Sequence, residues 1–149
     1  MQKTVIRSKQ ELKIKIPTSP IEGMPTKRMV YWAGSILQEP HKEVLHFSRR
    51  APSKIWVGWV DAGSPSERHS LYDNTFIMEI NSVKVDTLDD FLDNVLTVED
   101  NTFVRLKVMD AFRSTVKVIA IKTDYHYHPC WQVKLNSPRK PVMEILRRE

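Results

Sequence analysis

Two kinds of hydrophobic periodicity occur along the chain, and together they predict a mixed structure dominated by strands. Residues 55–60 and 76–80 are runs of apolar side chains, each followed by turn-forming residues. Such bounded runs are typical of β-strands. From residue 88 to 96, apolar side chains instead recur at i, i+3, i+4, i+7 and i+8. This spacing predicts an amphipathic helix, which a capping box at Thr87 and Asp90 begins.

Further elements are expected on both sides of this central unit. Alternating apolar and basic residues predict a half-exposed hairpin near the N-terminus, and longer runs predict a second hairpin after residue 100. We expect strands over residues 4–7, 12–16, 103–109 and 115–121, a short helix capped by Ser64, a helix after Pro40-His41, and two helical turns over 141–148. Residues 17–25 contain three prolines and one glycine, which is typical of a linker.

The apolar run over residues 29–38 is interrupted by Ala33-Gly34. A loop at this point can turn consecutive backbone N–H groups outward, and such a nest can hold a carboxylate. The alternative is that Gly34 only relieves a bend or bulge in a strand and that Trp32 belongs to the core.

The net charge of +5 is unevenly distributed. Six acids and no base lie between Asp86 and Asp100, whereas the basic residues are dispersed along the chain. Nucleic-acid binders join a basic cluster to stacking aromatics, and the sequence does not show this combination. We therefore expect no nucleic-acid partner, although a small basic adaptor for nucleic acid stays one of the alternatives.

Hydropathy and cysteine content bear on the compartment. No apolar run approaches a membrane span, and the first residues are not followed by the apolar core of a secretory signal. Cys130 is the single cysteine, which excludes an internal disulfide and agrees with a reducing compartment. We expect a soluble, intracellular protein with no membrane partner.

Several separated motifs occur in the order found in one protein family. They are the Gly63-Ser-Pro turn, Asn74-x-Phe-Ile-x-x-Ile-Asn81, Val85-x-Thr-Leu-x-x-Phe91, Val30-Tyr-Trp-Ala-Gly-Ser-Ile-Leu-Gln38, Pro40-His41, Asn101-Thr-Phe-Val-Arg-Leu106 and His126-Tyr-His-Pro129. The chain resembles a PDZ domain of the HtrA-type serine proteases, and in particular the last PDZ-like domain of the fungal nuclear, pro-apoptotic HtrA-like proteases. The resemblance covers roughly Lys3 to Pro129.

The resemblance implies an α+β, mainly β fold. This is a PDZ-like, partly open antiparallel β-barrel or sandwich of five or six strands, capped by two helices, with an N-terminal hairpin and a C-terminal tail. Residues 1–27 would be the hairpin and Pro-rich linker, the hairpin being similar to the end of a preceding PDZ domain. Residues 28–125 would be the PDZ-like domain and residues 126–149 the tail.

The resemblance also implies a peptide-binding site. In PDZ domains a loop holds the C-terminal carboxylate of a peptide, which adds as a strand beside the next run while its last side chain enters a pocket against the long helix. The matching positions are Trp32, Ala33, Gly34 and Ser35 for the loop, Ile36, Leu37 and Gln38 for the pairing strand, and Leu88, Phe91, Leu92 and Val95 for the helix.

The function that follows is a non-catalytic PDZ-like interaction module of an HtrA-like serine endopeptidase. Its partners would be C-terminal or internal peptide segments of proteins, or neighbouring protease or PDZ domains, and its location would be the nucleus by resemblance and otherwise the cytoplasm. The alternative is a purely architectural PDZ-like domain whose groove is occupied by its own chain.

Neither serine-protease chemistry nor a zinc site is supported by the sequence. A chymotrypsin-like protease needs a serine in a Gly-x-Ser-Gly-type loop, and the serines that follow a glycine, Ser35 and Ser64, lack it. His126, His128 and Cys130 alternate, so in an extended segment they would point to one side, but a zinc site needs a fourth ligand and the sequence offers no second cluster. We expect no catalytic residue, no metal and no cofactor.

Overall fold

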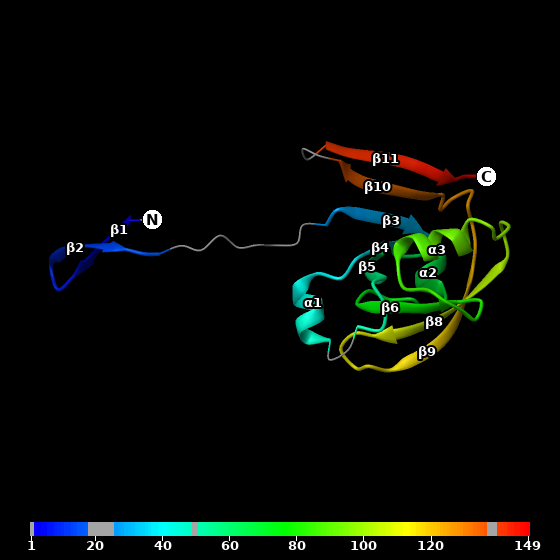
Figure 1. Cartoon of the computed structure of the whole chain (residues 1–149), viewed down its shortest axis with the longest axis horizontal. Helices are drawn as coiled ribbons and strands as arrows, with labels where there is room; N and C mark the ends of the chain where they lie inside the picture. The colour runs from blue at the N-terminus through cyan, green and yellow to red at the C-terminus, as the bar shows by residue number, and fades with distance from the viewer. Residues whose placement is uncertain (1, 18–25, 49–50, 137–139) are drawn as a thin grey trace.

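The structure is a computed structural model that describes residues 2–17, 26–48, 51–136 and 140–149. Eleven strands and three helices lie in these ranges. In chain order they are β1 (Gln2–Arg7), β2 (Gln10–Lys15), β3 (Arg28–Trp32), β4 (Ser35–Gln38), α1 (Lys42–Phe47), β5 (Trp56–Val60), α2 (Pro65–Arg68), β6 (Thr75–Ile80), β7 (Val83–Lys84), α3 (Leu88–Val95), β8 (Phe103–Asp110), β9 (Val116–Lys122), β10 (Cys130–Asn136) and β11 (Lys140–Arg147) (Figure 1).

One antiparallel sheet of nine strands organises residues 28–147. Its order is β11-β10-β3-β4-β5-β6-β8-β9, and β7 pairs with β6 beside this path. The expectation of a mainly β, antiparallel fold with helices is confirmed. The sheet is larger than the expected five or six strands. The three helices of the described residues lie where the sequence predicted helices, after Pro40-His41, after Ser64 and from residue 88.

Turn and cap chemistry explains where the central elements begin and end. Ser64 caps α2 by accepting a hydrogen bond from the Glu67 N–H at 3.3 Å. The predicted capping box of α3 is present, because Thr87 Oγ1 accepts from the Asp90 N–H and the Asp90 carboxylate accepts from the Thr87 N–H. Asn81 and Ser82 both have positive φ, as a two-residue turn with the twist of a hairpin requires.

Helix α3 covers one face of the sheet and closes the main core. Its apolar stripe is buried together with Val30, Trp32 and Leu37 of β3 and β4. The rings of Trp32 and Phe91 meet edge to face, with centroids 5.4 Å apart. A second, smaller cluster of Trp56, Phe76, Met109 and Ala111 lies against Val44 of α1 and Met78.

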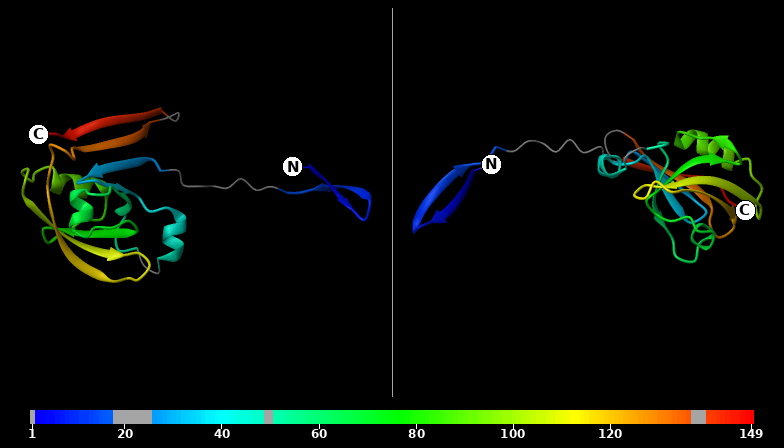
Figure 2. Two further views of the ribbon diagram at one scale, coloured as in Figure 1. Left: turned by 180° about the vertical axis from the view of Figure 1, so that it is seen from behind. Right: turned by 90° about the horizontal axis from the view of Figure 1, so that it is seen from below.

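The C-terminal residues belong to the sheet. β10 pairs with β3 and β11 pairs with β10, so the three strands run side by side (Figure 2). The prediction of two helical turns over 141–148 is wrong. An eight-residue segment is too short for a stable isolated helix, and the register with β10, in which Met143 lies opposite Val133, stabilises it as a strand.

The N-terminal hairpin is confirmed as two paired strands. β1 and β2 form a separate two-stranded sheet, joined by Ser8 and Lys9, which both have positive φ. Every side chain from Lys3 to Lys15 is exposed.

Among the described helices, none combines the length and the apolar character that a membrane crossing requires.

Candidate functional site

The predicted carboxylate loop is a two-residue hairpin turn. Trp32 and Ser35 pair with each other, and Ala33 and Gly34 between them have φ of 51° and 83°. The Ser35 hydroxyl donates a hydrogen bond to the Trp32 carbonyl at 2.7 Å. All four residues are buried, and Trp32 and Ser35 are 0% exposed.

The start of α2 covers this turn. The Ser66 N–H donates to the Ala33 carbonyl at 3.0 Å, and the Asp61 N–H donates to the Gly34 carbonyl at 2.8 Å. A Cβ atom placed on Gly34 would lie only 2.1 Å from Ser64 Cβ. The turn is therefore packed against Ser64, and both of its carbonyl groups accept hydrogen bonds from the chain.

The predicted pairing strand, β4, has two protein neighbours. It pairs with β3 through Tyr31 opposite Ile36 and with β5 through Ile36 opposite Trp59. Leu37 is fully buried and Gln38 is 8% exposed, whereas Ile36 is half-buried. Because a strand has two hydrogen-bonding edges, β4 offers no free edge to a peptide in this structure.

The predicted helix positions all face the sheet. Leu88, Phe91, Leu92 and Val95 are between 0% and 5% exposed. Their neighbours across the interface include Val30 and Cys130 of β3 and β10. The structure thus brings seven of the eleven predicted residues into one buried cluster, namely Trp32, Ala33, Leu37, Leu88, Phe91, Leu92 and Val95. Strand β3 lies beside β4, and β10 lies beside β3. Peptide binding by these residues stays a prediction.

The C-terminal strand holds the far end of α3. The Arg147 guanidinium donates to the carbonyls of Leu96 and Val98 and lies 4.5 Å from the centroid of the Tyr125 ring. The Tyr125 hydroxyl donates to the Val95 carbonyl at 3.0 Å. A cation at the C-terminal end of a helix is electrostatically favourable, so β11 and Tyr125 hold this end of α3 on the sheet.

A polar cluster beside the turn was missed by the sequence interpretation. The Tyr31 hydroxyl donates to Asp61 Oδ2 at 2.9 Å and lies 3.1 Å from His128 Nδ1. Burial, and then the hydrogen bond to Asp61, raises the pKa of Tyr31 above its ordinary value of 10.0. The three residues lie on β3, after β5 and before β10, so only the sheet register brings them together.

The serines and the possible metal ligands have other roles. Ser35 and Ser64 hold the turn and cap α2. His126 and His128 lie in a turn before β10 and not in an extended segment, so they do not alternate on one strand with Cys130. Burial raises the pKa of the Cys130 thiol to about 12. Within the described residues no group of three or more His, Cys, Asp or Glu could hold a metal ion.

Three relatives found by comparison with known proteins carry the same name. No protein-family model matches the chain. It is 32% identical over 145 residues to the pro-apoptotic serine protease NMA111 of Debaryomyces hansenii, 36% over 130 residues to that of Meyerozyma guilliermondii, and 33% over 129 residues to that of Aspergillus niger. These matches cover 97%, 87% and 87% of this chain but only 15%, 13% and 12% of the relatives.

One solved structure is also similar. It is the HtrA3 PDZ domain bound to a phage-derived ligand, FGRWV, with 18% sequence identity and a TM-score of 0.49. The similarity covers 78% of this chain and 92% of that one.

Proposed function

The chain is homologous to a segment of the fungal pro-apoptotic serine proteases named NMA111, and from this premise we propose that it is a non-catalytic, PDZ-like interaction module of such a protease. The chain spans at most 15% of the length of the three relatives compared above. We propose that the chain acts as one part of such a protease and that residues outside it carry out the proteolytic step.

The pairing of β4 on both edges carries the proposal that the central groove is filled. A peptide that adds as a strand needs an edge with unpaired N–H and C=O groups. Here β3 takes one edge of β4 and β5 takes the other. We propose that the module binds through its outer surfaces, to neighbouring domains of the same protease, with the groove serving as core.

The competing proposal is that Trp32 to Gln38 and the inner face of α3 bind the C-terminus of a peptide. This requires β3 to leave β4 and Trp32 to leave its contact with Phe91. Seven of the eleven residues that a PDZ domain would use lie in one buried cluster, which supports keeping this proposal as the second candidate.

A peptide titration separates the two proposals. The full chain is titrated with an apolar pentapeptide as the free acid and as the C-terminal amide, and amide chemical shifts are followed. A filled groove leaves Gly34 and residues 88–95 unshifted by both forms. If the free acid alone shifts these resonances, with a Kd near the micromolar range typical of a modest affinity of about 8 kcal/mol, the groove is open and the competing proposal replaces ours.

The absence of catalysis is part of the same proposal. Ser35 and Ser64 are buried and serve a turn and a helix cap, so neither is placed to attack a peptide carbonyl. We expect no casein hydrolysis by the purified chain. Hydrolysis lost in Ser35→Ala or in Ser64→Ala would contradict this, and hydrolysis kept in both variants would point to a contaminant.

The relationship also supports a nuclear location, which we propose by resemblance to the fungal nuclear proteases. A fluorescent fusion of the protein that carries this chain tests it. Exclusion of the fusion from the nucleus would contradict the proposal.

A further inference from the structure

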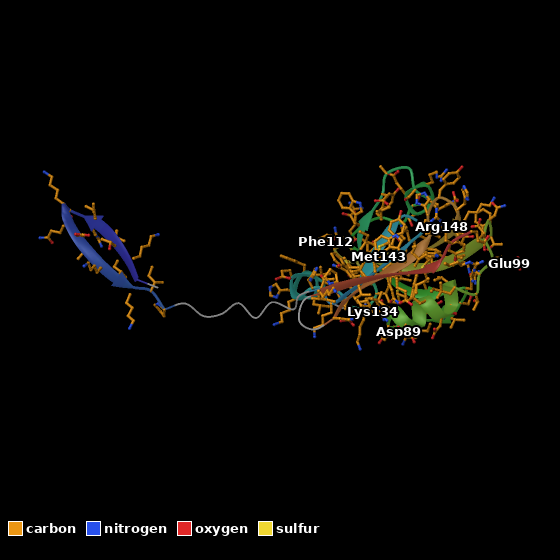
Figure 3. The ribbon with its side chains drawn as sticks, turned by 90° about the horizontal axis from the view of Figure 1, so that it is seen from above. Asp89, Glu99, Phe112, Lys134, Met143 and Arg148 are labelled. Atoms are coloured by element: carbon orange, nitrogen blue, oxygen red, sulfur yellow. The ribbon has the colours of Figure 1, made fainter. Side chains whose placement is uncertain are left out.

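The face of the sheet that turns away from α3 carries a continuous apolar row. Direct partners across five strands are Ile145, Trp131, Tyr31, Ile36 and Trp59. A second row beside it is Met143, Val133 and Met29. We call these eight residues the outer face. The side chains of Ile145, Met143 and Trp59 are 56%, 59% and 60% exposed. Figure 3 labels Met143 on β11 of the outer face and Asp89 on α3.

The aromatic part of the outer face is held rigidly. The rings of Tyr31 and Trp131 stack with centroids 4.8 Å apart and planes 4° from parallel. Asp61 accepts hydrogen bonds from the Tyr31 hydroxyl and from Trp59 Nε1, at 2.9 and 3.1 Å. Rigid aromatic side chains lose little conformational entropy when a partner covers them, so this face is suited to binding.

The Trp59 end of the outer face is acidic. A pocket of about 250 Å³ lies there, lined by Trp59, Val60, Glu67, Tyr72 and Asp73. Its lining contains two carboxylates and no base. The Lys117 ammonium already lies 4.9 Å from the centroid of the Tyr72 ring, which shows that an aromatic ring at this corner accepts a cation.

The hairpin β1–β2 has the complementary character. The register places Val5 opposite Leu12 and Lys3 opposite Ile14, so Val5, Leu12 and Ile14 share one face with Lys3 and Arg7. They are 38%, 42% and 46% exposed. The hairpin contains five bases and one acid, which are Lys3, Arg7, Lys9, Lys13, Lys15 and Glu11. A two-stranded sheet is marginally stable in water by itself, so this apolar face needs a cover.

We propose that the hairpin β1–β2 docks on the outer face, with Val5, Leu12 and Ile14 against the apolar rows and Lys3 and Arg7 of the same hairpin face toward the acidic corner. The tether permits it, because the twelve residues from 16 to 27 can span about 40 Å when extended. A short tether also gives an effective concentration on the order of millimolar, which favours the hairpin of the same chain over that of a second copy. The proposal rests on the proposed filled groove, because Tyr31 and Ile36 share the outer face only while β3 pairs with β4.

Paramagnetic relaxation tests the docking in the full chain. A nitroxide is attached at Lys9→Cys, where the native Cys130 does not compete because it is buried. The indole N–H signals of Trp59 and Trp131 should broaden severalfold more than those of Trp32 and Trp56, which face the interior. Equal broadening of all four signals overturns the proposal. The proposal is also overturned if selective broadening occurs only when chains that carry the nitroxide are mixed with ¹⁵N-labelled chains that lack it. Such broadening would report a contact between two copies of the chain.

Two matched variants test the face that docks. Leu12→Lys places a charge on the apolar face and should abolish the selective broadening. Ile6→Lys, on the opposite face of the hairpin and 77% exposed, should retain it. If both variants lose the broadening, or both keep it, the hairpin does not dock through Val5, Leu12 and Ile14, and the proposal fails.

Discussion

Gly34 and Ser64 are in such close contact that no side chain fits between them. A Cβ atom on Gly34 would lie 2.1 Å from Ser64 Cβ and 2.6 Å from Ser64 Oγ. Gly34 also has φ of +83°, where a Cβ atom is disfavoured. The turn between β3 and β4 and the first residues of α2 therefore interlock.

The first prediction is that Gly34→Ala destabilises the fold more than Gly63→Ala. Gly63 is the matched control, because its φ is +77° but nothing lies within 4 Å of the added Cβ. Both variants carry the strain of positive φ, and only Gly34→Ala adds overpacking, which costs about 1–3 kcal/mol. Urea denaturation measures both free energies of unfolding. Equal losses would mean that the turn and α2 can move apart.

The second prediction concerns the contact between α3 and the sheet. Phe91 is 0% exposed and meets Trp32, so Phe91→Ala should lower the free energy of unfolding by about 3–5 kcal/mol. Phe112→Ala is the control, since Phe112 is 65% exposed and should cost less than about 0.5 kcal/mol. A loss below about 1 kcal/mol at Phe91 would indicate an open groove.

The elements around residues 55–96 could be predicted from sequence because their determinants are local. The Thr87 to Asp90 capping box, the Ser64 cap and the Asn81-Ser82 turn each act within four residues. The positions of Leu88, Phe91, Leu92 and Val95 on one buried face follow from helical periodicity alone.

The surroundings of the candidate site could not be predicted in the same way. The filled groove that we propose depends on β4 lying between β3 and β5, and no local pattern specifies that Ile36 pairs with Trp59. The pairing of β10 with β3, in which Trp131 lies opposite Tyr31 one hundred positions earlier in the chain, has no local signal either. Residues 141–148 are equally compatible with a short helix and a strand until β10 lies beside them. The cluster of Tyr31, Asp61 and His128 depends on the same long-range pairing.

The third prediction tests the link between β11 and α3. Arg147→Met keeps an apolar stem but removes the hydrogen bonds to the Leu96 and Val98 carbonyls, so it should cost about 1–3 kcal/mol of unfolding free energy. Arg148→Met, at the next and exposed position, should change it by less than about 0.5 kcal/mol. Thermal or urea denaturation distinguishes them, and equal effects would show that β11 does not secure the helix.

The fourth prediction follows from the buried thiol. The pKa of Cys130 is raised by burial from 9.0 to about 12 in the folded chain. Above pH 9 the unfolded state therefore binds fewer protons than the folded state, and the free energy of unfolding falls as pH rises. Between pH 8 and about 10 the loss should be about 1 kcal/mol. In Cys130→Ala, urea denaturation should show an unfolding free energy that falls less steeply over the same pH range. The same pH slope in the variant and the original chain would contradict the prediction.

Amide hydrogen exchange of β4 tests the filled groove most directly. In a strand with neighbours on both edges, successive N–H groups are all hydrogen-bonded, whereas on an edge strand alternate N–H groups face solvent. Ile36, Leu37 and Gln38 should therefore all exchange slowly, while β11, at the edge of the sheet, should show alternating slow and fast exchange. An alternating pattern in β4 like that of β11 would show a free edge and contradict the filled groove.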